Sequence, residues 1–111
     1  MAHDVLHILQ PVGELCRRCS PPVHADELRT VYEIEGHSAS IFEERAPWDG
    51  VGDWTRMGVA RFRFFRSRRE WRLNWMRRDL RWHLYDPDEM PTDLAALVAI
   101  VDADEYGAFF G

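Results

Sequence analysis

Near its N-terminus the chain spaces its apolar residues three and four positions apart, which is the repeat of an amphipathic helix. Asp4 is suited to begin this helix, whereas Pro11 lacks a backbone N–H and disfavours an uninterrupted helix around it. We therefore expect either a kinked helix or two short helices, the second beginning at Pro11. The apolar stripe consists of Val5, Ile8, Leu9, Val12, Leu15, Cys16 and Cys19.

From Arg29 the repeat changes to two, which is typical of strands with one buried face. Residues 36–37, Gly-His, fit a two-residue hairpin loop, which places Glu35 opposite Ser38. Counting back from this turn gives the register and leaves one aromatic ring exposed, that of Phe42. The pairs expected on the core side are Ile34 with Ala39 and Tyr32 with Ile41, and those on the other side are Glu33 with Ser40 and Val31 with Phe42.

Arginines alternate with apolar residues in the stretch RFRFFRSRREWRLNW, residues 61–75. A loop centred on RSRR joins two strands there, and a tight turn at RRD leads to a fifth strand. Because side chains on one strand alternate between two faces, the bulky rings define an apolar face and the arginines define the opposite one. The expected facing pairs are Phe64 with Trp71, Phe62 with Leu73, Trp75 with Trp82, and Leu73 with Leu84.

Between the second and third strands, the segment 46–55 (APWDGVGDWT) is rich in glycine and contains Trp48 and Trp54. It is too irregular for a strand and longer than a simple hairpin turn. We expect a packing or functional loop, in which the tryptophans either pin the loop to the core or form the apolar walls of a cleft.

A second helix is predicted after Pro91 and Thr92, where Leu94, Leu97, Val98 and Val101 recur at helical spacing. Both helices need an apolar partner, and the aromatic face of the sheet is the large one on offer. The sequence therefore predicts a single α+β domain over residues 1–111. Its five-stranded antiparallel meander is covered on one face by an N-terminal and a C-terminal helix.

The same register predicts two rows of side chains on the uncovered face. One row holds Arg61, Asn74 and His83, and the other holds Arg63, Arg72 and Tyr85. The opposed like charges of Arg63 and Arg72 destabilise a sheet by roughly a few tenths of a kcal/mol unless an anion lies between them. That anion is either a carboxylate of the neighbouring hairpin or an external phosphate or carboxylate. The hairpin candidates are Glu33, Glu35 and Glu44.

Charge is unevenly distributed along the chain, which has a net charge of −5. Residues 56–81 hold ten arginines against two acids, Glu70 and Asp79, so the remainder is strongly acidic. The net negative charge and the absence of a sequence-specific nucleic-acid motif argue against extended duplex binding. Short single strands remain possible because an exposed ring supports base stacking.

Two further constellations have a functional and a structural interpretation. Cys16, Cys19 and His24 match a C-x-x-C and histidine pattern that would hold zinc if His37 or His3 supplied a fourth ligand. Both cysteines also lie on the apolar stripe, where free cysteine packs as a small hydrophobe. We favour the core interpretation and expect no metal and no cofactor.

The second constellation is a set of acidic, histidine and tyrosine side chains that would suit catalysis. Glu43, Glu44, Asp49, His83 and Tyr85 are able to supply a general acid and base. However, the sequence contains no nucleophile elbow, phosphate loop or metal-binding pair of acids, so solvated strand ends are the favoured interpretation and an enzyme is not. The weak catalytic candidates are Glu44, His83 and Tyr85.

No window is apolar for long enough to span a bilayer, and MAHDVLHIL lacks the basic and apolar regions of a secretory signal. We therefore expect a cytoplasmic protein without membrane contact.

Several stretches together resemble a family: IFEERAPW (41–48), WTRMGVARFRF (54–64), WRLNW (71–75), RWHLY (81–85) and the closing FFG. From about residue 21 to residue 111 the chain is similar to the small bacterial family catalogued as a domain of unknown function, number three thousand and twenty-four. The resemblance implies a similar size and layout and no established reaction, cofactor or partner. Phe110, where the family leads us to expect tryptophan, and Cys19 depart from it. The matching positions are Glu43, Glu44, Arg45, Trp48, Trp54, Arg61, Arg63, Trp82 and His83.

Three functional hypotheses follow. The first is a non-enzymatic binding module for an anionic partner, which is an acidic protein segment, a short single-stranded nucleic acid or a phosphorylated ligand. The second is a small enzyme or ligand pocket between residues 43–54 and His83. The third is a homodimer formed through the open sheet face, with Phe42, Met76 and Tyr85 as apolar contacts. The predicted ligand-binding residues are Arg61, Arg63, Arg72, His83, Tyr85, Trp48 and Trp54.

Overall fold

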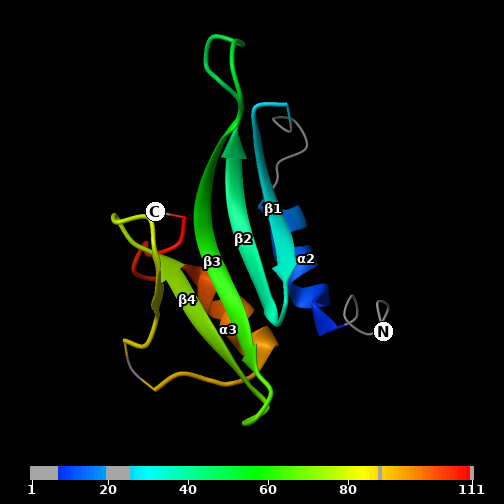
Figure 1. Cartoon of the computed structure of the whole chain (residues 1–111), viewed down its shortest axis with the longest axis vertical. Helices are drawn as coiled ribbons and strands as arrows, with labels where there is room; N and C mark the ends of the chain where they lie inside the picture. Colours follow the sequence, from blue (N-terminus) through cyan, green and yellow to red (C-terminus); the bar gives the residue numbers. More distant parts are fainter. Residues whose placement is uncertain (1–7, 20–25, 88, 111) are drawn as a thin grey trace.

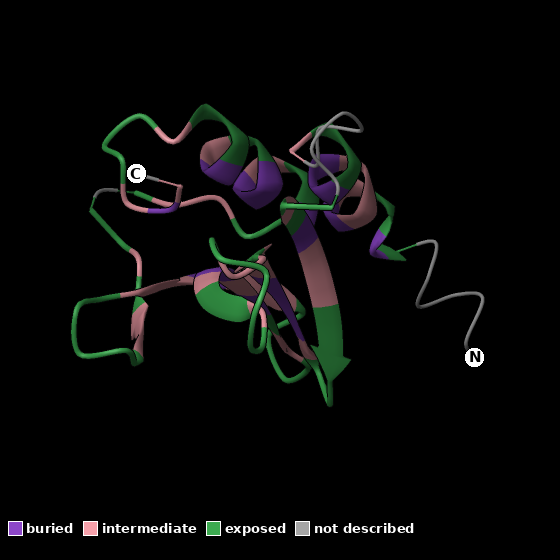
Figure 2. Cartoon of the chain, turned by 90° about the horizontal axis from the view of Figure 1, so that it is seen from above, coloured by how far each residue is buried: buried purple, intermediate pink, exposed green. Residues whose placement is uncertain are grey.

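The computed structural model describes residues 8–19, 26–87 and 89–110. These residues form a five-stranded antiparallel sheet in the order β1-β2-β3-β4-β5, with two helices on one of its faces (Figure 1, Figure 2). The predicted α+β class and the meander covered by an N-terminal and a C-terminal helix are confirmed. The elements are α2 (Gln10–Arg18), β1 (Leu28–Glu35), β2 (Ser38–Arg45), β3 (Thr55–Phe65), β4 (Glu70–Met76), β5 (Trp82–Leu84) and α3 (Leu94–Ala103).

Helix α2 begins close to Pro11, as the second of the two alternatives for the N-terminal stripe predicts. Proline is tolerated there because the N–H groups of a first turn have no partner within the helix. Val12 and Leu15 are fully buried against the rest of the core. At the other end of the helix, Arg18 Nη2 lies 3.2 Å from Asp102 Oδ2 on α3, which links the two helices. The predicted stripe residue Val5 and the predicted cap Asp4 lie outside the described residues.

Helix α3 has a polar cap at each end. The carboxylate of Asp93 accepts a hydrogen bond from the Ala96 N–H at 3.1 Å, an N-cap that begins the helix two residues after Pro91. Asp104 ends the helix in the left-handed region (φ 44°), and its carboxylate accepts the N–H groups of Phe109 and Phe110 at 3.0 and 2.9 Å. The C-terminal segment is thereby folded back so that Phe109 is buried.

The core lies between the helices and one face of the sheet. Figure 2 shows buried residues on the sides of the helices that face the strands. Burying this much apolar surface is the dominant stabilising term for a domain of this size. The largest fully buried side chains are Phe62, Leu15, Ile41, Leu73, Leu97, Val12 and Val101.

Two of the predicted hairpin registers are confirmed. In β1 and β2, Ile34 pairs with Ala39, Tyr32 with Ile41, Glu33 with Ser40 and Val31 with Phe42. In β3 and β4, Phe64 pairs with Trp71, Phe62 with Leu73, Arg63 with Arg72 and Arg61 with Asn74. The face opposite the helices, which we call the outer face, therefore carries the arginines of β3.

A bulge changes the phase of β3 in a way that the sequence did not predict. Ile41 pairs with Ala60, but the next residue, Phe42, pairs with Gly58, which leaves Val59 as an extra residue. Val59 and Ala60 are both buried as a result. The bulge brings Gly58 to the outer face beside Phe42.

The predicted register of β4 and β5 is wrong by one residue. Trp75 pairs with His83 and Met76 with Trp82, whereas the sequence led us to expect Trp75 opposite Trp82 and Leu73 opposite Leu84. The cause is the turn, in which Arg77 N donates to Arg81 O at 3.2 Å. This closes a three-residue loop whose last residue, Leu80, has φ 61°.

A one-residue shift moves every side chain of β5 to the opposite face. Trp82 consequently lies on the outer face and His83 on the helix side. Tyr85 also lies on the helix side, where its ring centroid is 6.0 Å from that of Trp75 and 4.9 Å from that of Phe109. Neither His83 nor Tyr85 therefore belongs to the outer rows to which the sequence assigned them.

The outer-face position of Trp82 depends on the missing side chain of Gly58. A Cβ built there would lie 2.7 Å from Met76 Cε and 3.0 Å from Trp82 Cη2. Phe42 adds an edge-on contact with Trp82, with ring centroids 6.2 Å apart, so Phe42 is half-buried rather than exposed.

We predict that Gly58→Ala lowers the free energy of unfolding by about 1–3 kcal/mol, because the indole cannot yield as the end of Met76 can. Urea unfolding of the wild type and the variant measures this change.

Gly13→Ala is the matched control, since the added Cβ meets no atom closer than 3.7 Å and the site is in the interior of helix α2. It should raise the free energy of unfolding by about 0.5–1 kcal/mol. Stabilisation by both substitutions would contradict the packing of Trp82 over Gly58.

Candidate functional site

One half of the outer face is a closed network of ion pairs. Glu44 on β2 contacts Arg29 Nε on β1 at 2.7 Å and Arg56 Nη2 on β3 at 2.9 Å, and Arg56 Nη1 reaches Glu33 at 2.7 Å. These contacts, with the Arg29 hydrogen bond as the largest cause, lower the pKa of Glu44 from its ordinary value of 4.5. Two arginines, Arg29 and Arg56, are therefore neutralised from within the protein on this half, whereas the sequence alternative concerned Arg63 and Arg72.

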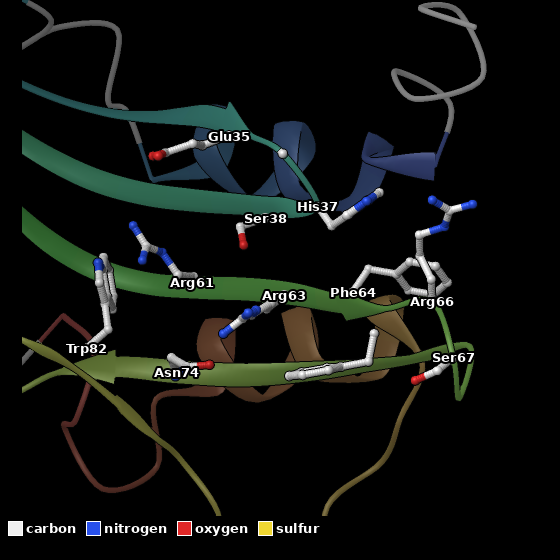
Figure 3. Close-up of a pocket in the computed structure, with 12 residues that line it drawn as sticks. Glu35, His37, Ser38, Arg61, Arg63, Phe64, Arg66, Ser67, Asn74 and Trp82 are labelled. Atoms are coloured by element: carbon white, nitrogen blue, oxygen red, sulfur yellow. The ribbon is translucent and has the colours of Figure 1, made fainter.

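The other half of the outer face is an open groove of about 690 Å³ (Figure 3). Its walls come from all five strands, from the β1–β2 turn and from the β3–β4 turn. The lining residues are Glu35, Gly36, His37, Ser38, Arg61, Arg63, Phe64, Phe65, Arg66, Ser67, Asn74 and Trp82. The volume is within the usual range of small-molecule sites, about 300–1,000 Å³.

Arg61 is held in the groove without a carboxylate. Its Nε donates to Ser40 Oγ at 2.8 Å, and its Cζ lies 4.8 Å from the centroid of the Trp82 ring. Figure 3 shows the guanidinium beside the indole, on the side of the sheet opposite the helices. A hydroxyl and an aromatic ring orient the guanidinium but leave its charge uncompensated.

Arg63 is exposed and also lacks an acidic partner. Its Cζ lies 5.1 Å from the Phe65 ring centroid, and no carboxylate of the described residues is within ion-pair distance of Arg61 or Arg63. Arg72, directly opposite Arg63, is 5.5 Å from the same ring and 3.5 Å from Glu70 Oε2. Of the opposed pair, only Arg72 has a carboxylate of the described residues beside it.

The hairpin carboxylates do not compensate Arg63. Glu33 and Glu44 are engaged by Arg56 and Arg29, and Glu35, although it lines the groove, makes no ion pair with another described residue. The sequence left open whether the arginines are neutralised internally. The structure separates two cases, a compensated network at one end of β3 and an uncompensated pair of arginines at the other.

Comparison with known proteins assigns the chain to a family. The model of the domain of unknown function DUF3024 matches residues 3–111. The chain is a DUF3024 domain. No curated protein and no solved structure matches it.

Four residues that the sequence assigned to binding lie outside the groove of the DUF3024 domain. His83 Nε2 is 2.8 Å from Asp79 Oδ2, a contact that lowers the pKa of Asp79. Burial raises the pKa of Tyr85 on the helix side. Trp48 is 96% exposed in the connection that projects beyond β2 and β3 (Figure 1), and Trp54 lies under the guanidinium of Arg29, 4.2 Å from Cζ to the ring centroid.

The catalytic candidates do not meet. Glu44 lies on β2 and His83 on β5, with β3 and β4 between them. The best-formed pockets of the described residues are lined by neither Glu44 nor His83, and Glu44 is occupied by two arginines. The pocket predicted between residues 43–54 and His83 stays a prediction that these pockets do not support.

The proposed dimer surface also changes. Phe42 and Met76 lie on the outer face but pack around Trp82 and Gly58, and Tyr85 lies on the helix side. The homodimer stays a prediction that has lost one of its three apolar contacts.

The cysteines belong to the core. Cys16 is buried and Cys19 is partly buried, and burial raises the pKa of the Cys16 thiol to about 12. His3 and His24, the other zinc candidates, lie outside the described residues. Within residues 8–19, 26–87 and 89–110 no group of three or more His, Cys, Asp or Glu side chains is arranged to hold a metal. None of the helices in those ranges is long and apolar enough to cross a membrane.

The groove thus shares only two residues with the predicted ligand-binding set, and several of its lining residues, Trp82 among them, were missed. Arg61 and Arg63 line it as predicted, Arg72 adjoins it, and Trp82 replaces His83 and Tyr85. The position of Trp82 follows from the length of the β4–β5 loop, for which the sequence carries no compositional signal.

The lowered pKa of Glu44 predicts a pH dependence of stability. A carboxyl group whose folded pKa is depressed stabilises the fold above its unfolded pKa, near 4.5, and this contribution is lost as the pH falls through the folded pKa. Glu44→Gln should lower the free energy of unfolding by up to about 1 kcal/mol at pH 7. The difference from wild type should shrink as the pH falls below 4.5, which urea unfolding at several pH values measures.

Glu105→Gln removes an exposed carboxylate at the far end of the chain and controls for the change in net charge. An equal effect of the two substitutions at all pH values would contradict a specific role for the Glu44 network.

Proposed function

We propose that this DUF3024 domain is a non-enzymatic binding module, and that its groove binds an oxyanion of its partner, either a phosphate or a carboxylate. The observation that carries the proposal is the pair Arg61 and Arg63. They are neighbours on one face of β3, they line a groove of about 690 Å³, and they contact no described carboxylate.

The arrangement suits an anion for a geometric reason. Residues two apart on a strand point to the same side and are about 7 Å apart, so one oxyanion or two successive ones can lie between the guanidinium groups. Guanidinium groups form paired hydrogen bonds with carboxylate and phosphate, and these charge-assisted bonds are among the strongest in proteins.

Orientation within the groove supports the same function. Arg61 is fixed by Ser40 and Trp82 before any ligand arrives, so less side-chain entropy is lost on binding. Arg66 and His37 line the groove at its other end, where Figure 3 shows them near the turns. The arginine there extends the positive potential beyond the central pair.

Arg63→Glu tests the proposal. Because Arg63 is exposed and makes no ion pair with the described residues, the substitution should change the free energy of unfolding by no more than about 0.5 kcal/mol. Pyrophosphate should shift the Nε–Hε NMR signals of Arg61 and Arg63 in the wild type, and Arg63→Glu should weaken that binding at least about tenfold, which corresponds to about 1.4 kcal/mol.

Arg78→Glu is the matched control, since it makes the same charge change at an exposed arginine that does not line the groove. If both variants weaken pyrophosphate binding equally, the change in net charge alone explains the effect. If pyrophosphate leaves the Arg61 and Arg63 signals of the wild type unmoved, the proposed function is wrong.

A further inference from the structure

We infer that the ligand of the groove is a short segment of single-stranded nucleic acid, whose backbone follows β3 and whose bases stack on the aromatic and guanidinium groups of the groove. The inference rests on the proposed function and names the class of its anion. Its basis is the placement of rings between charges, which an oxyanion site alone does not require.

Rings and guanidinium groups alternate along the groove. Trp82 lies against Arg61 at one end, and Phe65 lies between Arg63 and Arg72 at the other. Proteins that bind single strands combine a positive groove with such rings, because every base presents a face for stacking. A phosphate held by each arginine would leave its base close to a ring or to a guanidinium plane.

The cationic track is short. Arg61, Arg63 and Arg66 line the groove in chain order and mark a path along β3 into the following turn (Figure 3). The arginines of the β4–β5 turn do not extend this path, because Arg77 and Arg78 line a separate pocket with Trp75, Gly107 and Ala108. Three cations therefore limit the footprint to a few nucleotides.

A duplex fits this surface poorly. The groove lies on the sheet face opposite the helices, so neither described helix is placed to enter a DNA groove from this surface (Figure 2). The net charge of −5 repels any polyanion that extends past the three arginines.

An acidic peptide gains less from the groove than a nucleic acid does. Peptides that bind to sheets usually add a strand at an edge, where backbone groups are free. The groove instead lies over β2, β3 and β4, whose neighbours on both sides occupy their backbone groups. A peptide would be left with side-chain contacts, whereas bases bring flat rings to the aromatic groups that line the site.

The edges of a base also find polar partners. Ser38 on β2 and Asn74 on β4 line the groove on either side of β3. Their hydroxyl and amide groups donate and accept hydrogen bonds, so they suit base edges better than they suit phosphate, which only accepts.

Fluorescence anisotropy with a labelled hexanucleotide of mixed sequence, as DNA and as RNA, tests the inference. Unlabelled hexaglutamate, thymidine monophosphate and a mixed-sequence duplex serve as competitors. We expect at least one hexanucleotide to bind and each competitor to be at least about tenfold weaker. The logarithm of the binding constant should fall with the logarithm of salt concentration with a slope of about −2, since each of about three phosphates contributes roughly −0.7.

Two variants locate the binding. Trp82→Ala should weaken the binding of the hexanucleotide about 5- to 150-fold, the range measured for loss of one stacked base. Trp48→Ala removes a tryptophan that is 96% exposed outside the groove and should leave binding unchanged. Because loss of Trp82 also removes a packing contact, Arg63→Glu provides a second test in a variant that keeps the indole.

Each other result overturns the inference in its own way. If hexaglutamate competes as well as the hexanucleotide, the partner is an acidic protein segment, and if thymidine monophosphate does, the ligand is a small phosphorylated molecule. Both results leave the proposed function standing. Equal binding of the duplex, a slope near zero, or failure of both hexanucleotides to bind rejects single-strand recognition, whereas the pyrophosphate titration alone decides the proposed function.

Discussion

The alternation of side chains along β3 and β4 is the constraint on which the rest of the structure depends. Phe62 and Leu73 are fully buried beneath the helices, and their neighbours in sequence, Arg61 and Arg72, must then lie on the outer face. The core therefore gathers arginines on one surface without any requirement for a ligand. Their charges have to be met on that surface, and the protein meets them in two ways. Carboxylates compensate the arginines near β1, and hydroxyl and aromatic groups hold those in the groove.

Trp82 makes it possible for the arginines of the groove to be held without carboxylates. A bulge at Val59 brings Gly58 to the outer face, the three-residue β4–β5 loop brings Trp82 there, and the indole lies over the glycine. Arg61 then rests on the indole instead of reaching for an acid. Two local irregularities of the sheet thus convert one end of a charged face into a groove with a ring at its wall.

The sequence was sufficient where a turn has an unambiguous length. The Gly36-His37 loop gave the register of β1 and β2, and inward rings gave that of β3 and β4. The predicted register of β4 and β5 was wrong because the left-handed position of their turn is occupied by Leu80 and not by glycine. The extra loop residue therefore has no compositional signal. That single residue misplaced His83, Tyr85 and Trp82 together. Which arginines find carboxylates was beyond prediction for another reason, because it depends on side-chain directions across three strands.

The position of Trp82 is the most direct test of this account, because the groove, the orientation of Arg61 and the stacking surface all depend on it. Nuclear Overhauser contacts between the indole protons on Cζ2 and Cη2 of Trp82 and the Hα protons of Gly58 measure it. We expect strong contacts between these groups and none from this indole to Leu73 or Val98 on the helix side. Contacts from Trp82 to those core residues, with none to Gly58, would contradict it.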